Sequence, residues 1–88
     1  MSELVLLLYS RPGCHLCDQA KAAMQPLVAR YGLRIEERNV ELDPGWERDY
    51  GEQIPVGLLA GRKMFKYRLD ANRLERSIQA HLRARGAS

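Results

Sequence analysis

Both cysteines of the chain lie in one short motif, Cys14-His15-Leu16-Cys17, directly after a Pro-Gly turn. Because they are three residues apart, their sulfurs share a face on the first turn of a helix and can close a disulfide with little backbone movement. Unpaired N–H groups and the positive end of the helix dipole favour the nucleophilic thiolate there. Cys14 is therefore the candidate attacking thiol, and Cys17 is the candidate resolving thiol.

A metal site is an alternative interpretation of this motif. A structural zinc ion needs four ligands, and the cysteine pair supplies two of them. The missing ligands would have to be His15, inside the motif, and His81, far downstream. The pattern therefore favours redox chemistry, and we predict no metal ligand. Two buried, inert cysteines are a further alternative, against which the Pro-Gly turn and the polar neighbours Arg11, His15 and Asp18 argue.

The length and hydropathy of the chain limit how many domains and membrane spans it can form. With 88 residues it is predicted to form one domain over residues 1–88. No apolar run is long enough to cross a membrane, and the run at residues 4–9 has the length of a strand. Because that run lacks a basic flank and a small-residue cleavage site, we expect no signal peptide and a cytoplasmic location.

The charges are unevenly distributed along the chain. Residues 1–60 hold 6 basic and 9 acidic groups, a net charge of −3, whereas residues 61–88 hold 8 and 2, a net charge of +6. The basic part could attract an acidic partner or a phosphate surface. Its helical arginines, however, lie where a helix would point outward, and no aromatic residues for base stacking accompany them. We therefore expect no nucleic-acid binding.

Strand and helix patterns alternate in the order β-α-β-α-β-β-α. Strands are expected at residues 3–9, 33–40, 56–60 and 63–67, and helices at residues 14–31, 44–50 and from 71 onward. The first two strands should be parallel, joined by a right-handed crossover, and the last two should form an antiparallel hairpin. Trp46, on the second helix, is interpreted as a packing residue.

Single residues mark where the helices should begin, bend and end. Asp43 and Asp70 are predicted N-caps of the second and third helices. Gly32 is a predicted stop of the first helix. Pro26 removes a backbone donor inside that helix and predicts a kink or a helix in two pieces. Residues 85–88 are expected to form a fraying tail.

This order of elements, with C-x-x-C after the first strand and Ile54-Pro55 before the third, resembles the glutaredoxin branch of the thioredoxin-like superfamily. Almost the whole chain resembles the small glutaredoxin-like proteins of bacteria. The resemblance implies an α/β thioredoxin-like fold, with a four-stranded mixed sheet flanked by helices. It also implies that Cys14 is the nucleophile, that Cys17 is the resolving thiol and that Pro55 is a cis-proline facing them. Arg11 matches the position where glutaredoxins usually carry a lysine that contacts glutathione.

Two positions depart from the glutaredoxin pattern. His15 and Leu16 stand where glutaredoxins usually have proline and an aromatic residue. Arg68-Leu69 stands where they carry a glycine pair before an aspartate, so Asp70 alone is carried over to hold one end of glutathione. Side chains at this place would crowd the ligand. We therefore predict weaker glutathione binding than in a typical glutaredoxin.

The leading hypothesis is a glutaredoxin-like thiol–disulfide oxidoreductase that acts on protein or low-molecular-weight disulfides. Its expected partner is a disulfide-containing protein or a glutathione-like thiol, with glutathione as a candidate co-substrate, no bound cofactor and a monomeric state. The competing hypothesis is a non-enzymatic thioredoxin-fold binding module or a protein that bridges zinc or an iron–sulfur cluster. The residues assigned to the site are catalytic Cys14 and Cys17, and substrate-binding Arg11, His15, Ile54, Pro55 and Asp70.

Overall fold

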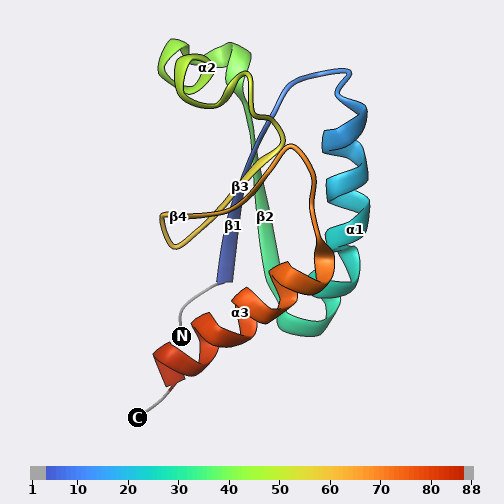
Figure 1. The fold of residues 1–88 in the computed structure, drawn as a ribbon, viewed down its shortest axis with the longest axis vertical. Helices are drawn as coiled ribbons and strands as arrows, with labels where there is room; N and C mark the ends of the chain where they lie inside the picture. The colour runs from blue at the N-terminus through green and yellow to red at the C-terminus, as the bar shows by residue number, and fades with distance from the viewer. Residues whose placement is uncertain (1–3, 87–88) are drawn as a thin grey trace.

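A computed structural model describes residues 4–86 of the chain. Four strands form one mixed sheet in the order β2-β1-β3-β4: β1 (Leu4–Ser10), β2 (Leu33–Asn39), β3 (Val56–Leu59) and β4 (Arg62–Lys66). β1 pairs with β2 in parallel and with β3 antiparallel, and β3 and β4 form an antiparallel hairpin (Figure 1). The predicted order of elements and the mixed sheet are thereby confirmed.

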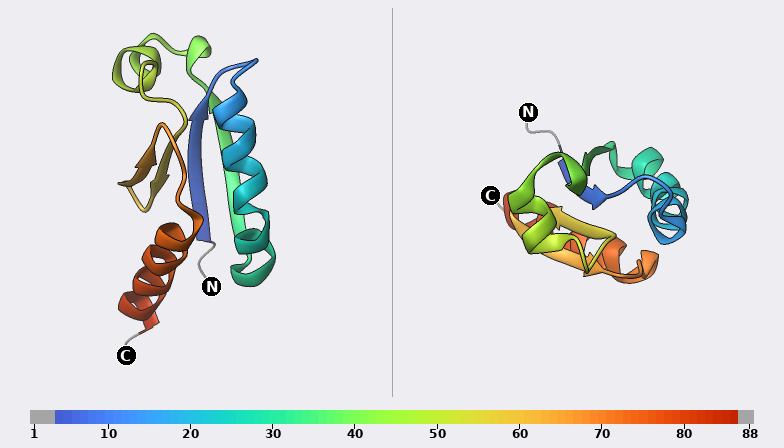
Figure 2. Two further views of the ribbon diagram at one scale, coloured as in Figure 1. Left: turned by 45° about the vertical axis from the view of Figure 1, so that its right-hand side comes forward. Right: turned by 90° about the horizontal axis from the view of Figure 1, so that it is seen from above.

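Three helices connect or follow these strands: α1 (His15–Tyr31), α2 (Pro44–Tyr50) and α3 (Ala71–Gly86). A single 3₁₀ turn, η1 (Val40–Leu42), precedes α2. Figure 2 shows α2 at the end of the sheet where β1 leads into the loop before α1, while α3 lies toward the opposite end. None of the described helices is long and apolar enough to span a membrane.

The central strand β1 supplies side chains to two apolar clusters, one on each face of the sheet. Because side chains alternate along a strand, Leu4, Leu6 and Leu8 join the main core, whereas Tyr9 joins a smaller cluster. The main core lies under α1 and α3, and includes Leu6, Leu8, Met24 and Ile78 with no exposed surface. The sheet therefore holds α1, and the cysteine motif at its start, against a packed face.

The smaller cluster attaches α2 to the same end of the sheet. Tyr9 stacks on Tyr50 with ring centroids 4.3 Å apart, and meets Trp46 edge-on at 5.8 Å. Val40 and Val56, both fully buried, complete the cluster. The packing role predicted for Trp46 is confirmed.

The helix caps follow the predicted local chemistry. Asp43 Oδ1 accepts hydrogen bonds from the N–H groups of Gly45 and Trp46, with Pro44 in the first turn of α2. Asp70 Oδ1 accepts one from the N–H of Arg73 at the start of α3. Gly32 ends α1 in the left-handed conformation, at φ +65°. These predictions are confirmed.

The two-piece helix predicted as one alternative at Pro26, and the fraying tail predicted for residues 85 and 86, are wrong. Helix α1 runs without a break through Pro26, so it is not in two pieces. Pro26 is exposed there, and water can satisfy the carbonyl that loses its donor. Arg85 and Gly86 belong to α3 and not to a fraying tail; the other tail residues, 87 and 88, lie outside the described residues, as does residue 3 of the first predicted strand.

Several strand ends differ from the prediction by one residue. β2 ends at Asn39 because Val40 turns into η1 and is buried beneath α2. β3 ends at Leu59 and β4 runs over Arg62–Lys66, since Ala60 and Gly61 form the hairpin turn with positive φ. Tyr67, expected in the last strand, leaves it with φ +65°.

Candidate active site at the start of helix α1

Cys14 is the N-cap of α1, and its sulfur faces the backbone of the first helical turn. The N–H of Cys17 donates a hydrogen bond to Cys14 Sγ at 3.2 Å, and the N–H of Asp18 donates to the Cys14 carbonyl at 3.1 Å. When the disulfide is reduced, such N–H groups stabilise a thiolate more than a thiol. The arrangement is therefore suited to a nucleophilic Cys14.

Cys14 and Cys17 are joined by a disulfide, with their Cα atoms 5.2 Å apart. The two residues differ in access to solvent. Cys14 is half-buried, whereas Cys17 is 2 % exposed and lies beneath the first turn of α1. After reduction, a large substrate could reach Cys14 more readily than Cys17. The roles of attacking and resolving thiol remain predictions, which this difference in access favours.

The Ile54–Pro55 segment lies at the same end of the sheet as the cysteine motif. β3 starts at Val56, which pairs with Tyr9 near the end of β1, and the loop to Cys14 leaves from that end. The Ile54–Pro55 peptide bond is cis. Pro55 is buried and Ile54 is half-buried. Antiparallel pairing of β1 with β3 is thus what brings these two sequence motifs together.

Arg11 is held by α2 and η1. Its Nη2 donates to both carboxylate oxygens of Glu47 at 3.0 Å and to the Gly51 carbonyl at 3.1 Å. Glu41 lies 3.6 Å from Nη1. The hydrogen bond to Glu47 is the main cause that raises the pKa of Arg11 above its ordinary value. Arg11 was predicted from the sequence, but its acidic partners were not. The only sequence feature that could have indicated them is the group of acidic residues around the second helix.

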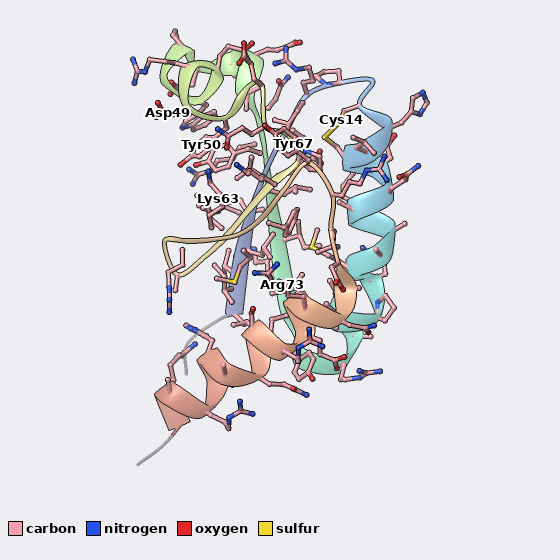
Figure 3. All side chains as sticks on the ribbon, viewed as in Figure 1. Cys14, Asp49, Tyr50, Lys63, Tyr67 and Arg73 are labelled. Atoms are coloured by element: carbon pink, nitrogen blue, oxygen red, sulfur yellow. A yellow bond between two sulfur atoms is a disulfide. The ribbon has the colours of Figure 1, made fainter. Side chains whose placement is uncertain are left out.

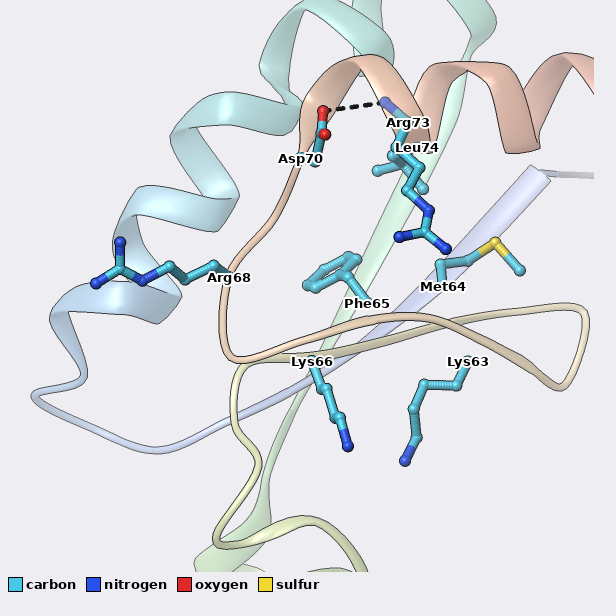
Figure 4. A pocket seen from close by; sticks show the side chains of 8 residues that line it. All are labelled: Lys63, Met64, Phe65, Lys66, Arg68, Asp70, Arg73 and Leu74. Carbon is cyan, nitrogen blue, oxygen red and sulfur yellow. Dashed lines mark hydrogen bonds between the residues drawn. The ribbon is translucent and has the colours of Figure 1, made fainter.

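His15 and Asp70 occupy different surroundings. His15 is exposed at the first position of α1, next to Cys14. Asp70 caps α3 on the border of a pocket of about 330 Å³. Figure 4 shows its carboxylate bonded to the backbone of Arg73, with Lys63 and Lys66 pointing to the opposite side of β4. The substrate-binding roles of both residues remain predictions.

The segment after β4 lies beside the cysteine motif. Arg68 and Leu69 share a pocket of about 260 Å³ with Leu16 and with three residues of the following α1 turns, Gln19, Ala20 and Ala23. Leu69 also packs against the main core. The sequence predicted side chains here in place of glycines. It did not predict the positive φ of Tyr67, because a tyrosine gives no sequence indication of this conformation.

No group of three or more His, Cys, Asp and Glu side chains in residues 4–86 is arranged to hold a metal ion. The sulfurs are instead engaged with each other.

Comparison with known proteins agrees with this geometry. The model of the Glutaredoxin-like domain (DUF836) family matches residues 5–79. The chain belongs to this glutaredoxin-like family. A glutaredoxin-like protein from Dictyostelium discoideum is 30 % identical over 83 residues, which cover 85 % of this chain and 75 % of that protein.

Solved structures identify the fold of this glutaredoxin-like chain. A protein from X. campestris superposes with a TM-score of 0.70 at 37 % identity, over 85 % of this chain and 96 % of that one. Thioredoxin from Halobacterium salinarum superposes with a TM-score of 0.65 at 17 % identity, over 90 % of this chain and 74 % of that one. The second likeness concerns the fold alone, and it confirms the predicted thioredoxin-like fold.

Proposed function

We propose that this glutaredoxin-like protein is a thiol–disulfide oxidoreductase for protein or low-molecular-weight disulfides. The Cys14 thiolate attacks one sulfur of the substrate disulfide, and the other substrate sulfur leaves as a thiolate. Cys17 then attacks Cys14 in the mixed disulfide and releases the second substrate thiol. Two protein thiols become one disulfide while one substrate disulfide becomes two thiols, and an external thiol reductant restores the protein.

The observation that carries this proposal is the hydrogen bond from the Cys17 N–H to Cys14 Sγ, at 3.2 Å. It supports a stabilised thiolate on the half-buried cysteine, with the partner cysteine buried one helical turn away. The family match supports the same chemistry.

Glutathione is proposed as a weak co-substrate. Arg11, the cation expected to meet a glutathione carboxylate, is already bonded to Glu47. Arg68 and Leu69 line the pocket beside Leu16. They stand where the glutaredoxin resemblance implies glycines, whose backbone N–H groups would face the other end of the ligand. The main partner that we propose is a disulfide-containing protein. The glutaredoxin-like chain itself is expected to act as a monomer in the cytoplasm.

Titration of free thiols, with metal analysis of the same sample, tests the proposal. The oxidised protein should gain two titratable thiols on reduction, contain no stoichiometric zinc or iron and remain a monomer. Cys17→Ser should accumulate a mixed disulfide with an added disulfide substrate, whereas Cys14→Ser should not. Thiols that stay free under a mild disulfide oxidant, or equal trapping by both variants, would refute the proposed function.

A further inference from the structure

Tyr67 has a backbone conformation that tyrosine rarely adopts. Its φ is +65°, and the N–H of Arg68 donates to the Lys66 carbonyl at 2.7 Å, which closes a three-residue turn around Tyr67. A γ-turn with positive φ at its centre is rare and strained. Glycine would adopt it without the steric cost that a Cβ atom brings.

Ala60 is the other non-glycine residue with positive φ in residues 4–86, at +52°, and the hairpin explains it. Ala60 and Gly61 form the two-residue loop between β3 and β4, and both have positive φ, as in the type I′ turns whose twist matches that of hairpin strands. No hairpin imposes this conformation on Tyr67. Packing does not compensate for it either, since Tyr67 is 48 % exposed.

Tyr67 lies between the two segments that form the redox site. Its N–H donates to the Gln53 carbonyl at 3.0 Å, which holds it beside Ile54–Pro55. The next two residues share a pocket with Leu16 of the cysteine motif. Figure 3 shows Tyr67 and Cys14 at the same end of the molecule. Strained residues cluster at sites where function requires them, so this position indicates a role at the site.

The ring of Tyr67 offers an exposed apolar surface at this position. Lys66 Nζ lies 5.5 Å from the ring centroid, a cation–π contact that restricts the ring from one side. Leu16, 36 % exposed, adds apolar surface inside the motif itself. Aromatic side chains supply large contact area for a bound peptide at a small cost in conformational entropy. A glycine at this position would offer none.

We propose that Tyr67 determines substrate specificity by packing against the residues that flank a cysteine in a polypeptide disulfide. The protein should then prefer such disulfides over small ones that have no flanking residues. This inference rests on the proposed function. Tyr67 takes no part in the bond changes: the reduced Cys14/Cys17 pair is oxidised, the substrate disulfide is reduced to two thiols, and the tyrosine contacts the substrate beside them.

Single-turnover kinetics test this role. The pre-reduced protein is mixed with the disulfide-linked dimer of an acetylated, amidated pentapeptide, whose central cysteine has leucine on each side, or with bis(2-hydroxyethyl) disulfide. Tyr67→Gly should lower the rate constant for the peptide disulfide about fivefold, as expected for one lost aromatic contact, and leave that for the small disulfide unchanged. Tyr67→Phe keeps the ring and should retain the original rate for both.

Ala60→Gly is the matched control. It relieves the same kind of backbone strain at a hairpin distant from the cysteines, so both glycine variants should raise Tm, but Ala60→Gly should change neither rate constant. Equal loss for both disulfides in Tyr67→Gly, or no loss for either, would overturn the specificity role while the proposed function stands. If the unsubstituted protein is oxidised by neither disulfide, the proposed function fails and this inference fails with it.

Discussion

Arg11 Nη2 donates a hydrogen bond to each carboxylate oxygen of Glu47, both at 3.0 Å. The same nitrogen donates to the carbonyl of Gly51 at the end of α2, so one side chain ties the loop before Cys14 to that helix. Both partners are partly exposed, with 31 % and 47 % of their side-chain surface accessible. Solvent screens such a pair, and it is weak enough for a single substitution to release the cation.

Glu47→Gln should improve the use of glutathione. Without the Glu47 charge, Arg11 is freer to bind a glutathione carboxylate, and the KM for a glutathione mixed disulfide should fall about threefold, as expected for one exposed ion pair. A coupled glutathione-reduction assay measures this. Glu52→Gln, which removes a nearby exposed carboxylate that forms no ion pair among residues 4–86, is the control. The same fall in that variant would assign the effect to net charge, and not to Arg11.

Cys14 should react with an alkylating agent before Cys17 in the reduced protein at neutral pH. The hydrogen bond from the Cys17 N–H and the helix N-terminus stabilise the Cys14 thiolate, whereas Cys17 is almost fully buried. Peptide mapping after brief exposure to iodoacetamide identifies the labelled residue. Cys14→Ser, labelled under the same conditions, reports the intrinsic rate of Cys17. Faster labelling of Cys17 in the unsubstituted protein would reverse the assigned roles.

Glu75→Gln should lower Tm at neutral pH but not in acid. Glu75 accepts a hydrogen bond from Tyr31 at 2.7 Å and pairs with Arg30, which links α3 to α1. The Tyr31 hydrogen bond, followed by that of Arg30, lowers the pKa of Glu75 below its ordinary value of 4.5. A carboxyl group whose pKa is lowered by folding stabilises the folded state at pH values above its ordinary pKa. This stabilisation is lost as the pH falls through the lowered pKa.

Thermal unfolding of both proteins from neutral to acidic pH measures this dependence. The difference in Tm between the unsubstituted protein and Glu75→Gln should have its full size at pH 7 and should vanish in strong acid. Glu36→Gln removes a carboxylate whose ion pair with Arg38 is long, at 3.8 Å, and it should change Tm little at any pH. A Tm difference that persists in acid would mean that the glutamine substitution perturbs packing instead of charge.

Gly57→Ala should destabilise the protein without altering the cysteine motif. A Cβ atom at this position would come within 2.2 Å of the Phe65 ring, which covers Gly57 from the neighbouring strand β4. The ring must move within a packed core, which should lower the free energy of unfolding by about 1–3 kcal/mol. Chemical denaturation measures the loss. At Gly86 a Cβ atom meets nothing within 4 Å, so Gly86→Ala should keep its stability.

Features that depend on neighbouring residues were predictable from the sequence. The apolar run of β1 predicted a central strand, and the spacing of Cys14 and Cys17 predicted a pair on one helical turn. Asp43 and Asp70 cap their helices because a carboxylate bonds to backbone N–H groups two or three residues away. Each of these relationships is completed within one turn of the chain, so the local residue types determine it.

Features that join distant residues were decided by the tertiary structure. The sequence contains acidic residues around α2, but the packing of that helix on Tyr9 selects Glu47 as the partner of Arg11. The left-handed conformation of Tyr67 likewise depends on the Gln53 carbonyl, which the sheet register places beside it. Partner choice and backbone strain at these two residues depend on strand order and helix docking, which no local pattern of residues determines.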